Sequence, residues 1–163
     1  MKIIHETAII YPNVIIEDDV YIGPYCVIGA PPEWKGKESN SKGVYIGQGT
    51  RLTGFVTIDS GAEGVTYIGK NCYIMKHTYI AHDCYLRDNV TISAGVCLAG
   101  MVEIGKGTNI GMNANVHQKV SVPGGCMIGM GTVITKKTRL QSDSKYAGVP
   151  AKYIGSNDRN NIP

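Results

Sequence analysis

Aliphatic residues recur at every sixth position along most of the chain. The longest unbroken series covers residues 68–140, and shorter series cover residues 10–28 and 46–58. In the long series, the position two residues before each aliphatic residue always holds a small or β-branched side chain. A period of six fits neither an α-helix, which repeats about every 3.6 residues, nor a continuous strand, which alternates every second residue. It fits short strands joined by tight turns, three to each coil of a parallel β-helix.

In such a coil the aliphatic residue and its small partner point inward, while glycine, asparagine and aspartate occupy the turns. Three hexads, or eighteen residues, make one coil, so the twenty hexads predict nearly seven coils stacked about 4.8 Å apart. Each coil contacts only its neighbours. Four cysteines fall at small inward positions, where we expect packed, reduced thiols: Cys26, Cys72, Cys84 and Cys126.

Two interruptions of the hexad indicate loops. Residues 31–37 contain two prolines, the single tryptophan and three charged residues, and they predict an excursion loop over about 30–43. Four extra residues near 61–64 are expected to bulge outward. Loops on a rigid scaffold are where binding and catalytic residues concentrate. The sequence predicts one β-helix domain over 1–155, closed by residues 145–152, and a loose polar tail over 156–163.

Composition supports this all-β interpretation. The chain has 163 residues, enough for one domain, and contains 20 isoleucines and 14 valines against 4 leucines, which excludes a helical bundle. No apolar run is long enough to span a membrane and no secretory signal is evident, so we expect a cytoplasmic protein. The net charge of +3, without a basic run, argues against a nucleic-acid partner.

The candidate chemistry lies at His82, two residues after an inward isoleucine. Steps of eighteen residues lead to Gly100 and then to Gln118, which has His117 beside it. One column therefore holds an imidazole, a glycine amide and a carboxamide. A histidine accepts protons near neutral pH, a neighbouring carboxylate such as Asp83 can orient it, and a glycine N–H can stabilise an oxyanion. These groups suit acyl transfer from a thioester to an alcohol or amine.

Three segments carry a resemblance to a known family. Residues 80–84 read Ile-Ala-His-Asp-Cys, residues 98–100 read Leu-Ala-Gly, and residues 115–118 read Asn-Val-His-Gln. They resemble the acyl-carrier-protein-dependent UDP-N-acetylglucosamine O-acyltransferases of lipid A synthesis, and the wider hexapeptide acyltransferase superfamily. Residues 28–33 and 57–59 are also similar to that family, so the likeness covers roughly 5–155. It implies a left-handed parallel β-helix that assembles as a homotrimer with clefts between subunits.

The resemblance implies His82 as general base, Asp83 as its support and Gly100 as oxyanion donor. The substrate-binding positions it implies are Glu33, Asp59, Tyr79, Met101, His117 and Gln118. Family members have histidines where this chain has Tyr79 and Met101, and a long C-terminal helical region that this sequence lacks. The ending Gly-Val-Pro-Ala-Lys at 148–152 is instead similar to the last coil of coenzyme A-dependent sugar acetyltransferases.

We therefore expect an acyltransferase that acts on a nucleotide-linked or related sugar in lipopolysaccharide or surface polysaccharide synthesis. Its donor would be acetyl-CoA or an acyl carrier protein. No permanently bound cofactor and no metal are expected. Four lysines are candidates for attracting the donor's phosphates, although solvated surface lysines are an equal explanation: Lys119, Lys136, Lys137 and Lys152.

Two alternatives remain open at this point. The γ-class carbonic anhydrases share the fold and bind zinc through three histidines, and His77, His82 and Cys84 reproduce their local spacing. A catalytic zinc needs a third protein ligand, yet no histidine lies between His5 and His77 to supply it from a preceding coil. The other alternative is a non-catalytic prism that binds a sugar nucleotide.

Overall fold

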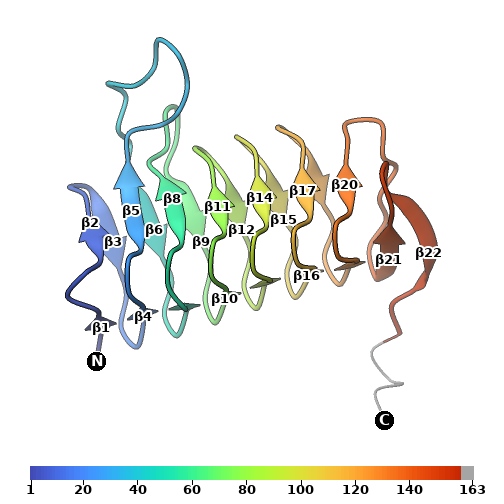
Figure 1. The fold of residues 1–163 in the computed structure, drawn as a ribbon, viewed down its shortest axis with the longest axis horizontal. Helices are drawn as coiled ribbons and strands as arrows, with labels where there is room; N and C mark the ends of the chain where they lie inside the picture. Colours follow the sequence, from blue (N-terminus) through green and yellow to red (C-terminus); the bar gives the residue numbers. More distant parts are fainter. Residues whose placement is uncertain (159–163) are drawn as a thin grey trace.

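The computed structural model describes residues 1–158 as a three-sided prism of stacked coils (Figure 1). Its short strands form sheets of nine, seven and six members, one on each side of the prism, and every pairing is parallel except the last one in the nine-stranded sheet. Within a coil the chain visits each sheet in turn, so Ile80 lies opposite Leu98 and Leu98 lies opposite Val116. Away from the two interruptions the register advances by eighteen residues per coil, and it advances by thirty residues across the excursion loop and by twenty-two across the insertion at 61–64. This stacking confirms the parallel β-helix predicted from the hexad.

The strands are short and regularly spaced. The nine-stranded sheet contains β1 (Ile3–Ile4), β4 (Tyr21–Ile22), β7 (Arg51–Leu52), β10 (Tyr73–Ile74), β13 (Thr91–Ile92), β16 (Asn109–Ile110), β19 (Met127–Ile128), β21 (Ser144–Ala147) and β22 (Lys152–Ser156). The seven-stranded sheet contains β2 (Ile9–Ile10), β5 (Val27–Ala30), β8 (Thr57–Asp59), β11 (Tyr79–Ile80), β14 (Cys97–Leu98), β17 (Asn115–Val116) and β20 (Val133–Ile134). The six-stranded sheet contains β3 (Val14–Ile16), β6 (Val44–Ile46), β9 (Thr66–Ile68), β12 (Tyr85–Leu86), β15 (Glu103–Ile104) and β18 (Ser121–Val122).

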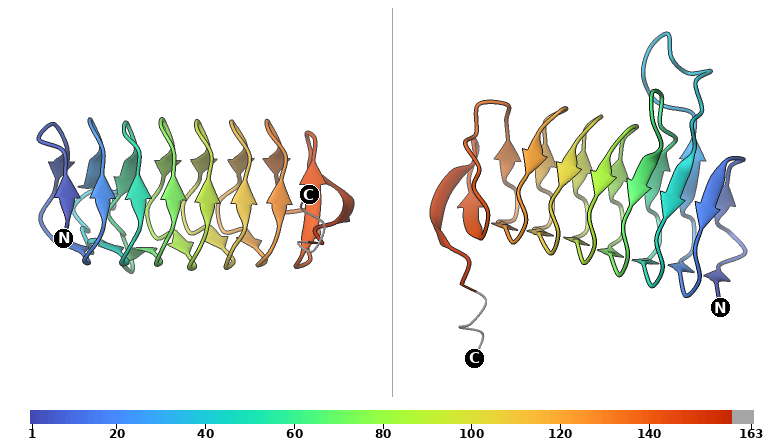
Figure 2. Two further views of the ribbon diagram at one scale, coloured as in Figure 1. Left: turned by 90° about the horizontal axis from the view of Figure 1, so that it is seen from below. Right: turned by 180° about the vertical axis from the view of Figure 1, so that it is seen from behind.

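The coil is left-handed, as the resemblance implied. In Figure 1 the chain advances from left to right while the near strands β5, β8 and β11 run upward, and the six-stranded sheet returns the chain behind them. Figure 2 shows the same stack from below and from behind, with successive coils of similar outline. A long solenoid of this kind presents the same corner of every coil along one edge, so residues eighteen apart form columns.

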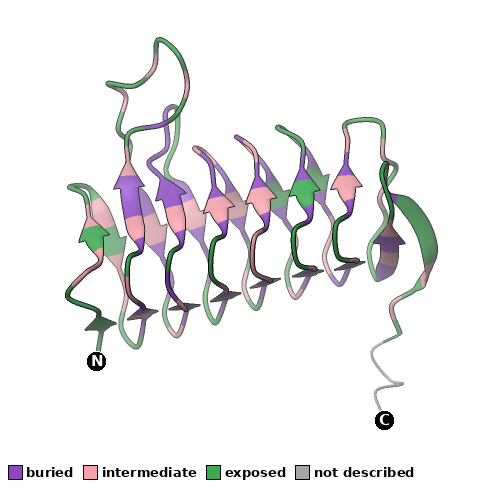
Figure 3. Cartoon of the chain, viewed as in Figure 1, coloured by how far each residue is buried: buried purple, intermediate pink, exposed green. Residues whose placement is uncertain are grey.

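The inward hexad positions build one continuous core, visible as the buried bands in Figure 3. From Ile22 to Ile134 every inward aliphatic side chain is at most 2% exposed. Burial of each such side chain stabilises the fold by about 1.5–3 kcal/mol before the entropy cost of ordering is counted. The four inward cysteines are buried and unpaired, as predicted.

The inward series extends one step further at each end than the aliphatic pattern suggested. Ile4 lies opposite Ile22, and Tyr146 lies opposite Ile128. Tyr146 is only 1% exposed, and its hydroxyl accepts a hydrogen bond of 2.8 Å from the Gln141 N–H. An aromatic ring therefore fills the last inward position, and the stack is longer than the nearly seven coils expected.

Both interruptions of the hexad rise from the same corner of the prism. Residues 31–43 connect β5 to β6 and project above the coils, with the four-residue insertion at 61–64 beside them (Figure 1). The Lys42 N–H donates to the Gly61 carbonyl at 2.8 Å, which ties the two segments together. The insertion at 61–64 bulges outward at this corner, as predicted: Glu63 and Gly64 are exposed, while Gly61 and Ala62 are buried.

The C-terminal end is closed by β21 and its antiparallel partner β22. The side-chain amide of Asn157 donates to the Gly125 carbonyl at 2.8 Å, so the first residues of the expected tail pack against the prism. The rest of that tail, residues 159–163, lies outside the described residues. Residues 1–158 contain no helix, and therefore none that could cross a membrane.

Candidate functional site

His82, Gly100 and Gln118 form a column at the corner between the seven-stranded and six-stranded sheets. The inward residues two positions before them are paired in register, which places the three on successive coils. Backbone bonds fix the spacing, because the Met101 N–H donates to the His82 carbonyl and the Lys119 N–H donates to the Gly100 carbonyl, each at 3.0 Å. The column predicted from spacing alone is present.

The imidazole of His82 is held by its neighbour. His82 Nδ1 lies 2.8 Å from Oδ2 of Asp83, and the two side chains are only 14% and 9% exposed. An ionised carboxylate only accepts hydrogen bonds, so in the neutral imidazole Nδ1 carries the proton and Nε2 has the lone pair. This tautomer can accept a proton at Nε2.

The carboxylate of Asp83 is in turn held by the insertion at 61–64. It accepts backbone N–H bonds from Ala62, Glu63 and Gly64 at 3.1, 3.0 and 2.7 Å. Burial raises the pKa of Asp83, but the hydrogen bonds from these N–H groups and from His82 outweigh it and leave that pKa below its usual value. The insertion therefore keeps Asp83 ionised and fixed in place.

Gly100 provides both space and a donor beside the imidazole. A Cβ atom on Gly100 would lie 2.5 Å from Cε1 and Nε2 of His82, so only glycine admits the ring in this position. The Gly100 N–H donates to no other group among residues 1–158. A free backbone donor next to Nε2 can stabilise negative charge on a reacting oxygen.

The excursion loop contributes Trp34, which the sequence analysis did not single out. Its indole stacks on the His82 imidazole with ring centroids 5.0 Å apart and an interplanar angle of 26°. The available signal was that the only tryptophan of the chain falls inside the first interruption of the hexad. Nothing in the spacing indicated that this loop returns to the column.

A pocket of about 390 Å³ opens over this column. Its lining includes the predicted Glu33, Met101 and Gln118, and the complete set is Glu33, Trp34, Lys35, His82, Gly100, Met101, Gln118 and Lys119. Both acidic and basic side chains are present, so the pocket can receive a ligand that carries polar and charged groups.

Two predicted site residues, Asp59 and Tyr79, are not part of the pocket lining but bond to each other. Tyr79 donates from its hydroxyl to Oδ2 of Asp59 at 2.6 Å, and the same oxygen is 3.4 Å from the Glu33 N–H. Burial raises the pKa of Asp59, which the Tyr79 hydrogen bond partly offsets. Burial and the bond to Asp59 together raise the pKa of Tyr79. This pair anchors the base of the excursion loop.

His117 lies outside the pocket lining. It is exposed, and its Nδ1 lies 3.1 Å from the carbonyl oxygen of Gln118. Of the predicted His-Gln pair, the carboxamide alone lines the pocket in this structure.

The side chains of the zinc alternative do not converge. His77 stacks on Phe55 at a different corner, with centroids 5.0 Å apart, while the Cys84 thiol is buried and donates to the Ala99 carbonyl. No group of three or more histidine, cysteine, aspartate or glutamate side chains in the part of the chain described here is arranged to hold a metal ion.

Comparison with family models matches most of the coil region. The bacterial transferase hexapeptide model (six repeats) matches residues 2–30 and 66–100, and the hexapeptide repeat of succinyl-transferase matches residues 101–136. Together these matches include the His82 and Gly100 steps of the column.

Individual relatives point in the same direction. The acyl-[acyl-carrier-protein]–UDP-N-acetylglucosamine O-acyltransferase of Thermodesulfovibrio yellowstonii is 46% identical over 74 residues, which is 45% of this chain and 22% of that protein. The enzyme of the same name from Campylobacter concisus is 30% identical over 117 residues, which is 69% of this chain and 45% of that protein. The chain thus spans less than half the length of these curated relatives.

Among solved structures, the UDP-N-acetylglucosamine acyltransferase from Campylobacter jejuni superposes with a TM-score of 0.79 at 27% identity, over 99% of this chain and 77% of that one. The hexad, the coil geometry and the family matches agree with one another. The chain therefore belongs to the hexapeptide-repeat acyltransferase superfamily.

Proposed function

We propose that this protein transfers an acyl group from a thioester to a hydroxyl or amino group of a nucleotide-linked or related sugar. The observation that carries the proposal is the hydrogen bond between Asp83 and His82 Nδ1, which leaves Nε2 as a proton acceptor beside the unpaired Gly100 N–H. General acid–base and oxyanion groups are thus adjacent in one pocket, and the names of the relatives describe this class of reaction.

In the proposed reaction, His82 Nε2 removes the proton from the acceptor as its oxygen or nitrogen attacks the thioester carbonyl. The new C–O or C–N bond converts the carbonyl oxygen to an oxyanion, to which the Gly100 N–H donates. Collapse restores the carbonyl and breaks the C–S bond, and the departing thiolate takes the proton back from Nε2. The ionised Asp83 stabilises the imidazolium that exists between the two proton transfers.

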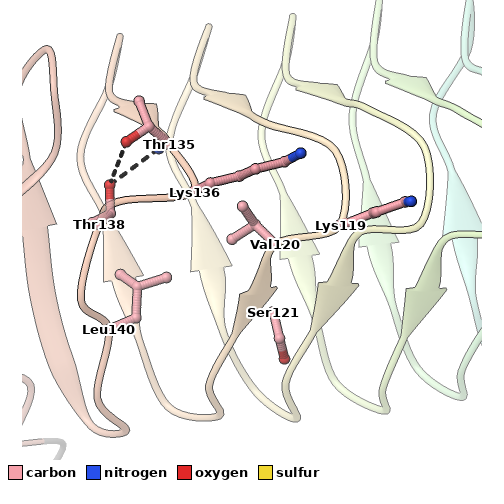
Figure 4. A pocket seen from close by; sticks show the side chains of 7 residues that line it. All are labelled: Lys119, Val120, Ser121, Thr135, Lys136, Thr138 and Leu140. Atoms are coloured by element: carbon pink, nitrogen blue, oxygen red, sulfur yellow. Dashed lines mark hydrogen bonds between the residues drawn. The ribbon is translucent and has the colours of Figure 1, made fainter.

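We propose that the acyl donor binds in a second groove of about 490 Å³, which shares Lys119 with the first pocket. In Figure 4 the side chains of Lys119 and Lys136 both extend along the prism toward the N-terminal coils, where His82 lies. Lys136 is three coils beyond His82, roughly 14 Å at the usual strand spacing. An extended pantetheine arm, common to coenzyme A and acyl carrier proteins, carries its phosphate at a comparable distance from its thioester.

The assembly and location are also proposals. We infer a homotrimer in the cytoplasm, where sugar nucleotides and acyl thioesters are available, with each column facing a cleft between protomers. Sedimentation analysis of the purified protein tests the trimer.

The activity is tested by a screen of acetyl-CoA and of short-chain and long-chain acyl carrier proteins against UDP-, dTDP- and GDP-sugars. With the productive pair, His82→Ala should lower kcat about 10²-fold or more without changing the sedimentation coefficient. His77→Ala removes a histidine from another corner and serves as the matched control. Unchanged turnover in His82→Ala would refute the proposed mechanism, and sugar-nucleotide binding without turnover would favour the non-catalytic prism.

A further inference from the structure

A closed ring of contacts joins both hexad interruptions to the catalytic pair. The Trp34 indole stacks on His82, and Lys37 Nζ lies over the indole, 5.5 Å from its centroid. Lys37 Nζ is also 3.6 Å from Oε1 of Glu63. The Glu63 N–H donates to Asp83, whose other carboxylate oxygen bonds His82. The ring thus runs through five residues and returns to the imidazole.

This arrangement leaves the imidazole few orientations. Asp83 binds Nδ1, and the Gly100 backbone is so close to the ring that no Cβ would fit between them. The Trp34 indole packs against one face of the same imidazole ring. A stacked aromatic pair favours its geometry on the order of 2- to 10-fold. Without Trp34, that preference for the orientation facing Gly100 is lost.

We propose that Trp34 is a positioning residue, latched by the Lys37–Glu63 ion pair, that holds His82 with Nε2 directed at Gly100. The indole is contacted by His82 and by the Lys37 ammonium group, so it is held against the imidazole at the pocket that it also lines. The kinetic consequence of this inference rests on the proposed function. The orientation of the ring does not, because it is a property of the free protein.

The ring orientation is tested by NMR of the histidine side chains in Trp34→Ala and Trp34→Phe. Loss of the indole should shift the His82 ring protons downfield and weaken their nuclear Overhauser effects to the Gly100 Hα protons, and phenylalanine should largely restore both. Phe55→Ala is the matched control, because Phe55 stacks on His77 with the same 5.0 Å separation and 26° angle. It should move the His77 signals only. Unchanged His82 signals in Trp34→Ala would overturn the inference.

Kinetic measurements on the same variants separate this inference from the proposed function. We expect Trp34→Ala to lower kcat about tenfold and to alter KM less, because misplacement of a catalytic group slows the chemical step. Trp34→Phe should recover most of the loss, and Phe55→Ala should retain the wild-type kcat. A displaced His82 ring with wild-type kcat would overturn the positioning role. Wild-type kcat in His82→Ala would instead overturn the proposed function and leave the ring geometry measured by NMR intact.

The latch is tested by acrylamide quenching of fluorescence, since Trp34 is the only tryptophan. Lys37→Met and Glu63→Gln should each increase the quenching constant about twofold, on the scale of a partly exposed ion pair. Glu63→Gln keeps the backbone N–H that donates a hydrogen bond to Asp83. The charge-reversed double variant, Lys37→Glu with Glu63→Lys, should return the constant toward the wild-type value. Equal quenching in all four proteins would show that the pair does not hold the indole.

Discussion

Replacement of Asp83 by asparagine tests the link between the 61–64 insertion and the chemistry. Oδ1 of Asp83 accepts from Glu63 and Gly64, while Oδ2 accepts from Ala62 and His82. If the asparagine carbonyl takes the Oδ1 position, two loop bonds survive and the amide NH2 faces His82. In the reverse orientation the NH2 faces two N–H donors, so the first orientation is favoured.

In the favoured orientation the amide donates to His82 Nδ1, which forces the imidazole proton onto Nε2. That tautomer cannot remove a proton from an acceptor. We expect kcat of Asp83→Asn to fall about 10²- to 10⁴-fold, or about 3–5 kcal/mol of activation free energy. The Ala62 N–H loses its acceptor, which should cost about 1–3 kcal/mol of stability and lower the melting temperature by about 2–12 °C.

Steady-state kinetics with the productive donor and acceptor, nitrogen NMR of the His82 ring and thermal denaturation measure the three effects. Asp88→Asn is the control, because Asp88 accepts the Lys70 N–H at 2.8 Å at another corner of the prism. It should melt near the wild-type temperature and keep its kcat, because an asparagine carbonyl can accept the same single N–H. Wild-type kcat in Asp83→Asn, with the proton found on Nε2, would refute the reasoning.

Three further predictions follow from the same structure. Gly100→Ala should lower kcat about 10²-fold while the protein stays folded, because the new Cβ displaces the His82 ring; a wild-type rate would contradict the 2.5 Å contact. Thr132→Val should raise the free energy of unfolding by about 1 kcal/mol, because the buried Thr132 hydroxyl has no hydrogen-bond partner among the described residues. Thr108→Val should lower the free energy of unfolding by about as much, because the Thr108 hydroxyl donates to a carbonyl at 2.8 Å. Equal shifts of the two variants in denaturant titrations would argue against this account. Burial raises the pKa of Asp59, so the folded protein holds this proton to a higher pH than the unfolded chain does. The resulting contribution to the free energy of unfolding is present at low pH and is lost as the pH rises through the raised pKa. The melting temperature of Asp59→Asn minus that of the wild type should therefore increase between pH 4 and pH 8, and a flat difference would contradict the raised pKa.

The site shows where prediction from the sequence stops. Spacing alone placed His82, Gly100 and Gln118 on one column, because the coils that hold them are eighteen residues long and backbone bonds keep them in register. Spacing did not reveal that His117 is not part of the pocket lining or that Trp34 stacks on the imidazole. Those facts depend on side-chain direction and on a loop that does not follow the repeat.

The insertion at 61–64 illustrates the same limit. Its outward bulge was expected, but the spacing did not indicate that the N–H groups of Ala62, Glu63 and Gly64 surround the Asp83 carboxylate. Asp83 has a positive φ of 59° at the coil corner, and Met101 and Lys119 have φ values of 62° at the same corner of the next two coils, so this backbone conformation belongs to the repeat. The hexad contains no information about which backbone donors a corner residue meets.

The hexad spacing was enough to predict the three-sided stack, its inward residues and the columns along its edges, while the left-handed coil was predicted from the family resemblance. These features are periodic, and each coil's position follows from hydrogen bonds to its nearest neighbours. The way residues 31–43 and 61–64 fold against each other beside His82 became known only from the folded molecule. Their contacts join segments without a repeat, so their conformation depends on particular donors, acceptors and rings that meet only after the prism has formed.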